Sequence, residues 1–133
     1  MANKNRDKGH RLERELATFF QSIGFPMCKT TRASSRLLDD TSIDLNFIPL
    51  LVQAKSGYEK SYPKYDKIAA TINELKVKNF PKSHPIHRLP IVLVHKLDGR
   101  KKERYYWSFD DQFARELLTN YFKDDTEDRE ILC

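Results

Sequence analysis

A run of four apolar residues, Ile91-Val92-Leu93-Val94, constrains the fold of this chain more than any other feature. A short apolar run without alternation is typical of a strand that is covered on both faces of a sheet. Elsewhere apolar residues recur at helical spacing, and Gly24 ends the first such segment, over about 7–23, as a C-terminal cap. We therefore expect an α/β fold in which helices flank a central sheet.

The order of elements follows from the same patterns. We expect helices at about 7–23, 64–79 and 111–122, strands within 27–32 and 42–55, and strands at 91–94 and 104–109. Residues 33–41 are polar and rich in serine, which predicts a loop. The apolar residues expected to face inward on the last helix are Phe113, Leu117, Leu118, Tyr121 and Phe122. The prediction is a central mixed sheet of about five strands.

The 133 residues fit a single domain, predicted over 1–122, with an acidic and flexible tail at 123–133. The whole chain has a net charge of +5. The tail holds two basic and five acidic residues, a net of −3, so the rest of the chain carries +8. A basic body is typical of proteins that bind polyanions.

No apolar run approaches 18 residues and the start lacks a signal peptide, so we expect no membrane span and a cytoplasmic location. Cys28 should be a buried apolar residue.

Two short apolar runs carry polar residues that suggest chemistry, Ser42-Ile43-Asp44-Leu45 and Leu51-Val52-Gln53-Ala54-Lys55. Side chains alternate along a strand, so Gln53 and Lys55 share one face. A hairpin turning at Ile48-Pro49 would place Asp44 close to opposite Gln53. A carboxylate, an amide oxygen and an ammonium would then meet, which suits a hard metal ion and a water that attacks a phosphodiester. Such residues also occur as ordinary strand ends and sheet edges.

An ordered set of motifs resembles a known family. The chain reads Lys8-Gly9-His10-Arg11-Leu12-Glu13-Arg14-Glu15-Leu16, then Gly24-Phe25, Arg32, Ser34-Ser35, Asp44 and Gln53-Ala54-Lys55. This order resembles the Holliday junction resolvases of the archaeal and phage type, within the PD-(D/E)XK nuclease superfamily. The resemblance covers residues 8–55 and extends as pattern only to 89–96 and 105–109. It implies a restriction-endonuclease-like core and a metal-dependent cut in branched DNA.

The resemblance places Glu13, Asp44 and Lys55 on catalytic positions, together with Gln53. It implies that Mg²⁺, or Mn²⁺ as a substitute, is held by Asp44, Gln53, Glu13 and the carbonyl of Ala54. Gln53 stands where the family usually has Glu. A Gln at this position resembles the variant found in Mrr-like nucleases. Because Gln is neutral, one ion is expected rather than two. The helical wheel permits either Glu13 or Glu15 to reach the site, because both flank the apolar stripe. Only the resemblance prefers Glu13, and Glu15 is interpreted as a solvated acid.

Residues expected to contact DNA lie in two basic segments. The polar loop before Asp44 contributes Arg32, Ser34, Ser35 and Arg36, and the resemblance favours Arg32 and one serine. A later segment that interleaves lysines with tyrosines contributes Lys60 and Lys64. A solvated charged loop explains this second segment nearly as well.

Three functions are consistent with the sequence. The first is a Mg²⁺-dependent Holliday junction resolvase, acting as a homodimer because a two-fold-symmetric junction is matched by two related active sites. The second is an Mrr-like or general phage recombination and repair nuclease that cuts duplex or flap DNA. The third is a non-catalytic nucleic-acid-binding module on the same fold, which only Gln53 favours. None of them requires a small-molecule organic cofactor.

Overall fold

The computed structural model describes residues 3–57, 63–97 and 104–123, with side chains from residue 9 onward. Its three longer helices are α1 (Asn3–Ser22), α4 (Tyr65–Asn79) and α5 (Asp111–Tyr121), and its short helices are α2 (Thr31–Ser34), α3 (Arg36–Asp40) and the 3₁₀ helix η2 (Pro85–Arg88). The strands are β1 (Lys29–Thr30), β2 (Leu45–Asn46), β3 (Leu51–Gly57), β4 (Ile91–Leu97) and β5 (Arg104–Ser108). No helix in this part of the chain is long and apolar enough to cross a membrane.

The strands form two sheets rather than the single sheet of five that we expected. β3, β4 and β5 form one sheet, in which β3 runs parallel to β4 and β4 runs antiparallel to β5. β1 and β2 form a separate antiparallel pair. The α/β class and a mixed sheet are therefore confirmed. Helix α4 lies on the connection between the two parallel strands, as a parallel pair requires.

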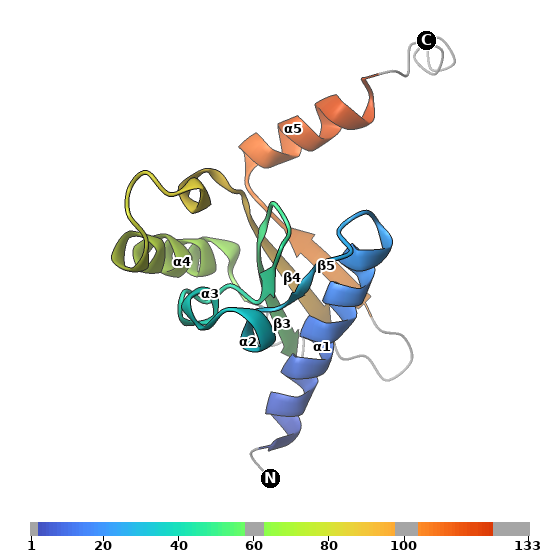
Figure 1. The fold of residues 1–133 in the computed structure, drawn as a ribbon. Helices are drawn as coiled ribbons and strands as arrows, with labels where there is room; N and C mark the ends of the chain where they lie inside the picture. Colours follow the sequence, from blue (N-terminus) through green and yellow to red (C-terminus); the bar gives the residue numbers. More distant parts are fainter. Residues whose placement is uncertain (1–2, 58–62, 98–103, 124–133) are drawn as a thin grey trace, which may run out of the picture.

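Strand β4 is the centre of the core, and all seven of its residues are buried. Alternate side chains of the sheet enter two apolar clusters. Val52, Val92 and Val94 pack with the α1 stripe that includes Leu12 and Leu16. On the other face, the second cluster joins Leu51 and Ile91 to residues of α4 and η2, including Ile72 and Ile86. Figure 1 shows α1 and α4 on either side of the sheet. The prediction of a strand covered on both faces is confirmed.

The segment between β1 and β2 is helical, which corrects two expectations. The strand predicted over 27–32 ends at Thr30, because α2 begins at the next residue. The loop predicted over 33–41 contains α3, which begins where the Oγ of Ser35 accepts a hydrogen bond from the backbone N–H of Leu38 at 3.2 Å. The hydroxyl of Thr31 is buried and donates to the carbonyl of Ile43 at 2.6 Å. Polar residues thus cap and anchor short helices here instead of forming an open loop.

The predicted hairpin of two adjacent strands is wrong in its pairing. β2 pairs with β1, with Thr30 opposite Leu45, and forms no ladder with β3. The chain turns at Phe47, which has a φ of 65° and donates its N–H to the side chain of Asn46 at 2.8 Å. One backbone hydrogen bond nevertheless joins the two segments, from the N–H of Asp44 to the carbonyl of Val52 at 2.8 Å. Asp44 therefore lies next to β3 even though β2 pairs with β1 and not with β3.

Helix α5 projects away from the rest of the chain, as Figure 1 shows, and none of its residues is buried. Asp110 caps its start by accepting from the N–H of Phe113 at 2.9 Å. Of the five residues expected to face inward, only Phe113 packs against the core. The others are exposed: Leu117, Leu118, Tyr121 and Phe122. The apolar stripe is present, but nothing in the described chain covers it.

The remaining expectations concern the cysteines and the tail. Cys28 is fully buried in the cluster beneath α1, as predicted, and burial raises the pKa of its thiol. The predicted acidic tail lies outside the described residues, except for Lys123.

Candidate active site

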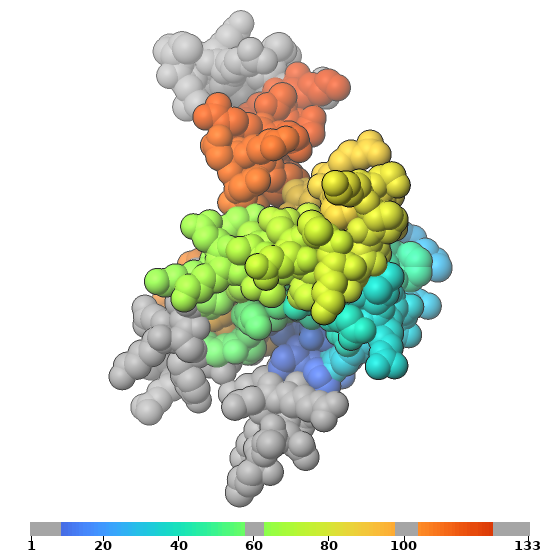
Figure 2. All heavy atoms as spheres, turned by 90° about the vertical axis from the view of Figure 1, so that its left-hand side faces the viewer, coloured from blue at the N-terminus to red at the C-terminus, as the bar shows by residue number. Residues whose placement is uncertain are grey.

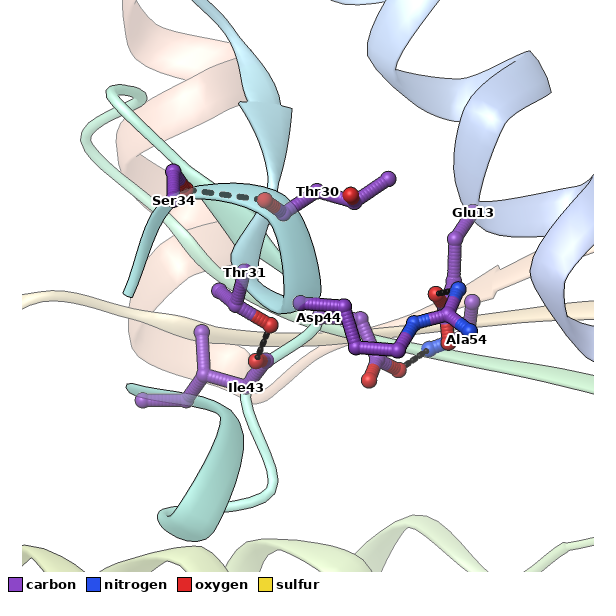
Figure 3. Close-up of polar contacts among 8 residues, drawn as sticks. Glu13, Thr30, Thr31, Ser34, Ile43, Asp44 and Ala54 are labelled. Atoms are coloured by element: carbon purple, nitrogen blue, oxygen red, sulfur yellow. Dashed lines mark hydrogen bonds and ion pairs between the residues drawn. The ribbon is translucent and has the colours of Figure 1, made fainter. Parts of the chain in front are cut away.

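Asp44 is held by backbone groups from two elements. Its Oδ2 accepts a hydrogen bond from the N–H of Ala54 at 2.7 Å, and its own N–H donates to the carbonyl of Val52. Its carbonyl accepts from the N–H of Thr31 at 2.9 Å. Because Val52 and Ala54 flank Gln53 on β3, the expected approach of Asp44 to Gln53 is confirmed. Figure 3 shows the carboxylate of Asp44 against Ala54.

The surroundings of Asp44 disfavour its negative charge. Burial is the largest cause and raises the pKa of Asp44 from 3.8 to about 7. The hydrogen bond from Ala54 and the charge of Lys55 lower this pKa, whereas the charges of Glu13 and Asp39 raise it further. Glu13 and Lys55 therefore each lie within electrostatic reach of Asp44. A buried carboxylate beside other acids is stabilised in its charged form when a cation is bound.

Glu13 reaches the site from α1, and Figure 3 shows its side chain pointing from that helix towards Asp44 and Ala54. Its Oε2 is in contact with the guanidinium of Arg32, on α2. Both side chains are mostly buried, with exposed fractions of 15% for Glu13 and 30% for Arg32. Arg32 was expected to contact DNA, and the structure places it against a candidate catalytic acid instead.

Glu15 lies on the opposite flank of α1, so the structure separates the two acids that the helical wheel left open. Its carboxylate accepts hydrogen bonds from the Nζ of Lys96 at 3.2 and 3.3 Å and from the hydroxyl of Tyr105 at 2.9 Å. The interpretation of Glu15 as a solvated acid is therefore wrong. Lys96 was not singled out from the sequence, although it continues the Val92–Val94 face of β4 towards α1.

The two remaining catalytic candidates lie on β3. Gln53 is half-buried and Lys55 is exposed. In a strand, the N–H and C=O of one residue point to the same edge, so the carbonyl of Ala54 also faces Asp44. Carboxylate, amide and carbonyl oxygens are ligands that Mg²⁺ accepts. Within the described residues, no three His, Cys, Asp or Glu side chains form a metal-binding group.

Asp39 is a residue that the sequence analysis missed. It lies on α3, in the segment predicted to be a loop, and its charge contributes to the raised pKa of Asp44. The pattern Leu37-Leu38-Asp39-Asp40 after a serine cap is the signal that could have predicted a short helix here.

The predicted DNA contacts divide into two groups. Ser34 donates to the carbonyl of Thr30 at 2.8 Å and Ser35 caps α3, so both hydroxyls already have partners within the chain. Arg36 and Lys64 have exposed side chains, and Arg36 lies 3.9 Å from Asp40. Lys60 lies outside the described residues. Ser34, like Arg36 and Lys64, is exposed, so these three predicted contacts remain accessible on the surface.

Comparison with protein-family models, with curated proteins and with solved structures finds no match to this chain. The Asp44 site therefore has to be interpreted from its own geometry and from the motif order in the sequence. The geometry consists of a half-buried carboxylate held by β3, a second acid from α1 and a lysine on β3.

Proposed function

We propose that this chain is a metal-dependent endonuclease with a restriction-endonuclease-like core and that its preferred substrate is branched DNA, a four-way junction above all. The observation that carries the proposal is the environment of Asp44. A half-buried carboxylate is fixed by the N–H of Ala54, with Glu13 and Lys55 close enough to shift its pKa. An acid, a second acid and a lysine around one strand are the groups that phosphodiester hydrolysis needs.

Mg²⁺, or Mn²⁺ in its place, fits the oxygens of Asp44, Glu13, Gln53 and the carbonyl of Ala54. When bound, the ion supplies positive charge to the scissile phosphate and makes a water more acidic. Asp44 keeps its charge in that state because the cation offsets the cost of burial. Because Gln53 is neutral, the set holds two anionic groups, which supports one ion rather than two.

Lys55 performs the second part of the chemistry in this proposal. Its ammonium donates a hydrogen bond either to the attacking water or to a non-bridging oxygen of the phosphate. The water loses a proton to solvent and forms a new bond to phosphorus, one ester P–O bond breaks, and the leaving oxygen takes a proton from solvent. Arg32 holds Glu13 from the side of α2, which fixes the carboxylate in the absence of substrate.

The charge distribution supports DNA as the partner. Residues 1–122 carry +8, and Arg36 and Lys64 are exposed near the start of α3 and α4. A homodimer is part of the proposal, because symmetric incision of a junction needs two sites related by a two-fold axis. The exposed apolar residues of α5, such as Leu118 and Tyr121, are a surface that a second copy would cover.

A cleavage assay tests the proposal directly. A labelled four-way junction, linear duplex, flap and single strand are each incubated with Mg²⁺, Mn²⁺ or EDTA. The wild type should make paired, metal-dependent nicks in the junction. Asp44→Asn should abolish cleavage and keep or tighten DNA binding, because it removes a negative charge near phosphate. Asp40→Asn, which changes an exposed acid on α3, is the matched control and should cut normally. Near-normal cutting by Asp44→Asn would contradict the metal assignment.

Gln53 favours two alternatives that the same assay separates. Cutting of all four substrates would indicate an Mrr-like or general recombination nuclease. Tight binding without cutting in any metal would indicate a nucleic-acid-binding module.

A further inference from the structure

A cavity lies on the α4 side of the sheet, and none of the residues described around Asp44 lines it. Its volume is about 300 Å³, and its walls come from α4, η2, the first residue of β4 and the first turn of α5. Figure 2 faces this side of the molecule, with α4 in the centre, the yellow segment that includes η2 beside it and α5 above. None of the candidate nuclease residues lines it.

Lys76 lines this cavity and is the unusual residue in it. Its side chain comes from the buried face of α4, one turn after Ile72, and the residue is only 6% exposed. Within the described chain, no hydrogen bond or ion pair is made by its side chain. Burial lowers its pKa, and no neighbouring carboxylate offsets that effect. The residue is buried while its ammonium has no anionic partner among the described residues, so a ligand of opposite charge would stabilise it.

Lys96 shows what a buried lysine of this protein looks like when it is paired. It is 8% exposed, much like Lys76, but its Nζ contacts both carboxylate oxygens of Glu15. The two lysines therefore differ in partner and not in burial.

The other polar groups around the cavity indicate which kind of ligand fits. The hydroxyl of Tyr65 donates to the carbonyl of Ile91 at 2.8 Å, and Asp110 caps α5, so both are already engaged. Arg88 is exposed at the rim and adds a second positive charge beside Lys76. Glu116 is also exposed at the rim, on α5, and its charge does not shift the pKa of Lys76.

We propose that this cavity binds a phosphate monoester, with Lys76 at its floor and Arg88 at its rim. A phosphate monoester carries close to two negative charges at neutral pH, which matches one ammonium and one guanidinium. A cavity of about 300 Å³ is large enough for the phosphate group and a small substituent. The same group occurs free in small molecules and at the 5′ end of a DNA strand. The proposal does not depend on the nuclease assignment.

The test uses the full chain in EDTA, so that metal binding at Asp44 does not contribute. Calorimetry measures binding of inorganic phosphate, and then of an oligonucleotide with a 5′-phosphate against its 5′-hydroxyl twin. Wild type should bind phosphate saturably and should melt at higher temperature in its presence. Lys76→Met keeps the apolar stem and removes the charge, so binding should be lost. Lys78→Met, on the exposed side of the same helix, should bind like wild type.

Arg88→Ala provides a second variant at an exposed position where folding is not at risk, and it should weaken phosphate binding at least ~10-fold, as loss of one charged contact does. Preference for the 5′-phosphorylated strand over inorganic phosphate and over the 5′-hydroxyl twin would assign the site to DNA ends. Equal binding of the two oligonucleotides, with phosphate binding retained, would assign it to small phosphorylated molecules. The proposal is overturned if wild type shows no saturable phosphate binding, or if Lys76→Met or Arg88→Ala binds phosphate as well as wild type.

Discussion

The two flanks of α1 carry the same kind of side chain in opposite settings. Glu13 points to one side, where it meets Arg32 and adds to the negative field around Asp44. Glu15 points to the other side, where Lys96 and Tyr105 satisfy it. Both acids are paired with a cation, yet only the first lies near a carboxylate with a strongly raised pKa. Pairing alone therefore does not distinguish the candidate catalytic acid from the structural one; the raised pKa of the neighbouring Asp44 does.

The largest expected contrast comes from making the same substitution on both flanks. Glu13→Gln should lower junction cleavage by ~1000-fold if Glu13 helps hold the ion, a loss comparable to removing one group that stabilises a transition state. Glu15→Gln should leave cleavage within about 3-fold of wild type, since Glu15 lies on the other side of the helix. Single-turnover rates at saturating Mg²⁺ measure both. Equal losses in the two variants would mean that the comparison is wrong.

The pH dependence of the free energy of unfolding tests whether the pKa of Asp44 is raised in the folded protein. Its pKa in the folded protein is about 7, above the usual 3.8, so the folded state holds a proton that the unfolded state releases between pH 4 and 7. In EDTA, stability should fall as pH rises through this window, by an amount on the order of 3 kcal/mol. Urea unfolding at several pH values measures it. Asp44→Asn should flatten the profile, whereas Asp40→Asn should not. The same slope in wild type and Asp44→Asn would show that another group causes it.

Substitutions at Glu15, on the other side of α1, should lower the stability of the protein rather than its activity. Glu15→Gln removes the carboxylate that accepts from the buried ammonium of Lys96, which should cost about 1 to 3 kcal/mol. A double-mutant cycle with Lys96→Met isolates the pair, because the double variant removes both charges and should recover part of the loss. Thermal unfolding in the absence of DNA measures each variant. If the losses of the two single variants simply add, the pair contributes nothing.

The smallest effect is expected at the exposed surface. Arg36 lies 3.9 Å from Asp40 with 94% of its side chain exposed, so Arg36→Ala should change stability by less than ~0.5 kcal/mol. If Arg36 touches a DNA phosphate, the slope of log K against log salt should decrease by about one. Binding titrations at several salt concentrations measure it, with Arg115→Ala on α5 as the control. An unchanged slope would remove Arg36 from the predicted DNA surface.

Much of the site was predictable because it depends on short-range order along the chain. The apolar run at Ile91 predicted the buried central strand, and the spacing of Asp44 from Gln53 predicted their approach. The first depends on strand geometry, which the pattern of side chains largely determines. The second holds although the predicted hairpin is wrong, because Asp44 hydrogen-bonds to Val52 and Ala54.

The rest depended on contacts that no local pattern encodes. The partner of β2 is β1, because pairing is decided by which strands the whole fold brings together. Arg32 meets Glu13 only because α2 turns the chain after Thr30, and α2 has too few residues for a helical period to show. The apolar stripe of α5 is real, but periodicity shows which face is apolar and not whether anything covers it.

The parallel pairing of β3 with β4 has a consequence for how this protein is made. Leu51 pairs with Ile91, so the strand that carries Gln53 and Lys55 is aligned by a segment that the ribosome delivers much later. Pairs this distant in sequence form only after a long loop closes, at a cost in chain entropy. A nascent chain that has reached Lys64 thus already carries Glu13, Asp44, Gln53 and Lys55, but not the strand that holds β3 in place. The candidate site is completed only when the C-terminal half of the described chain has folded onto it.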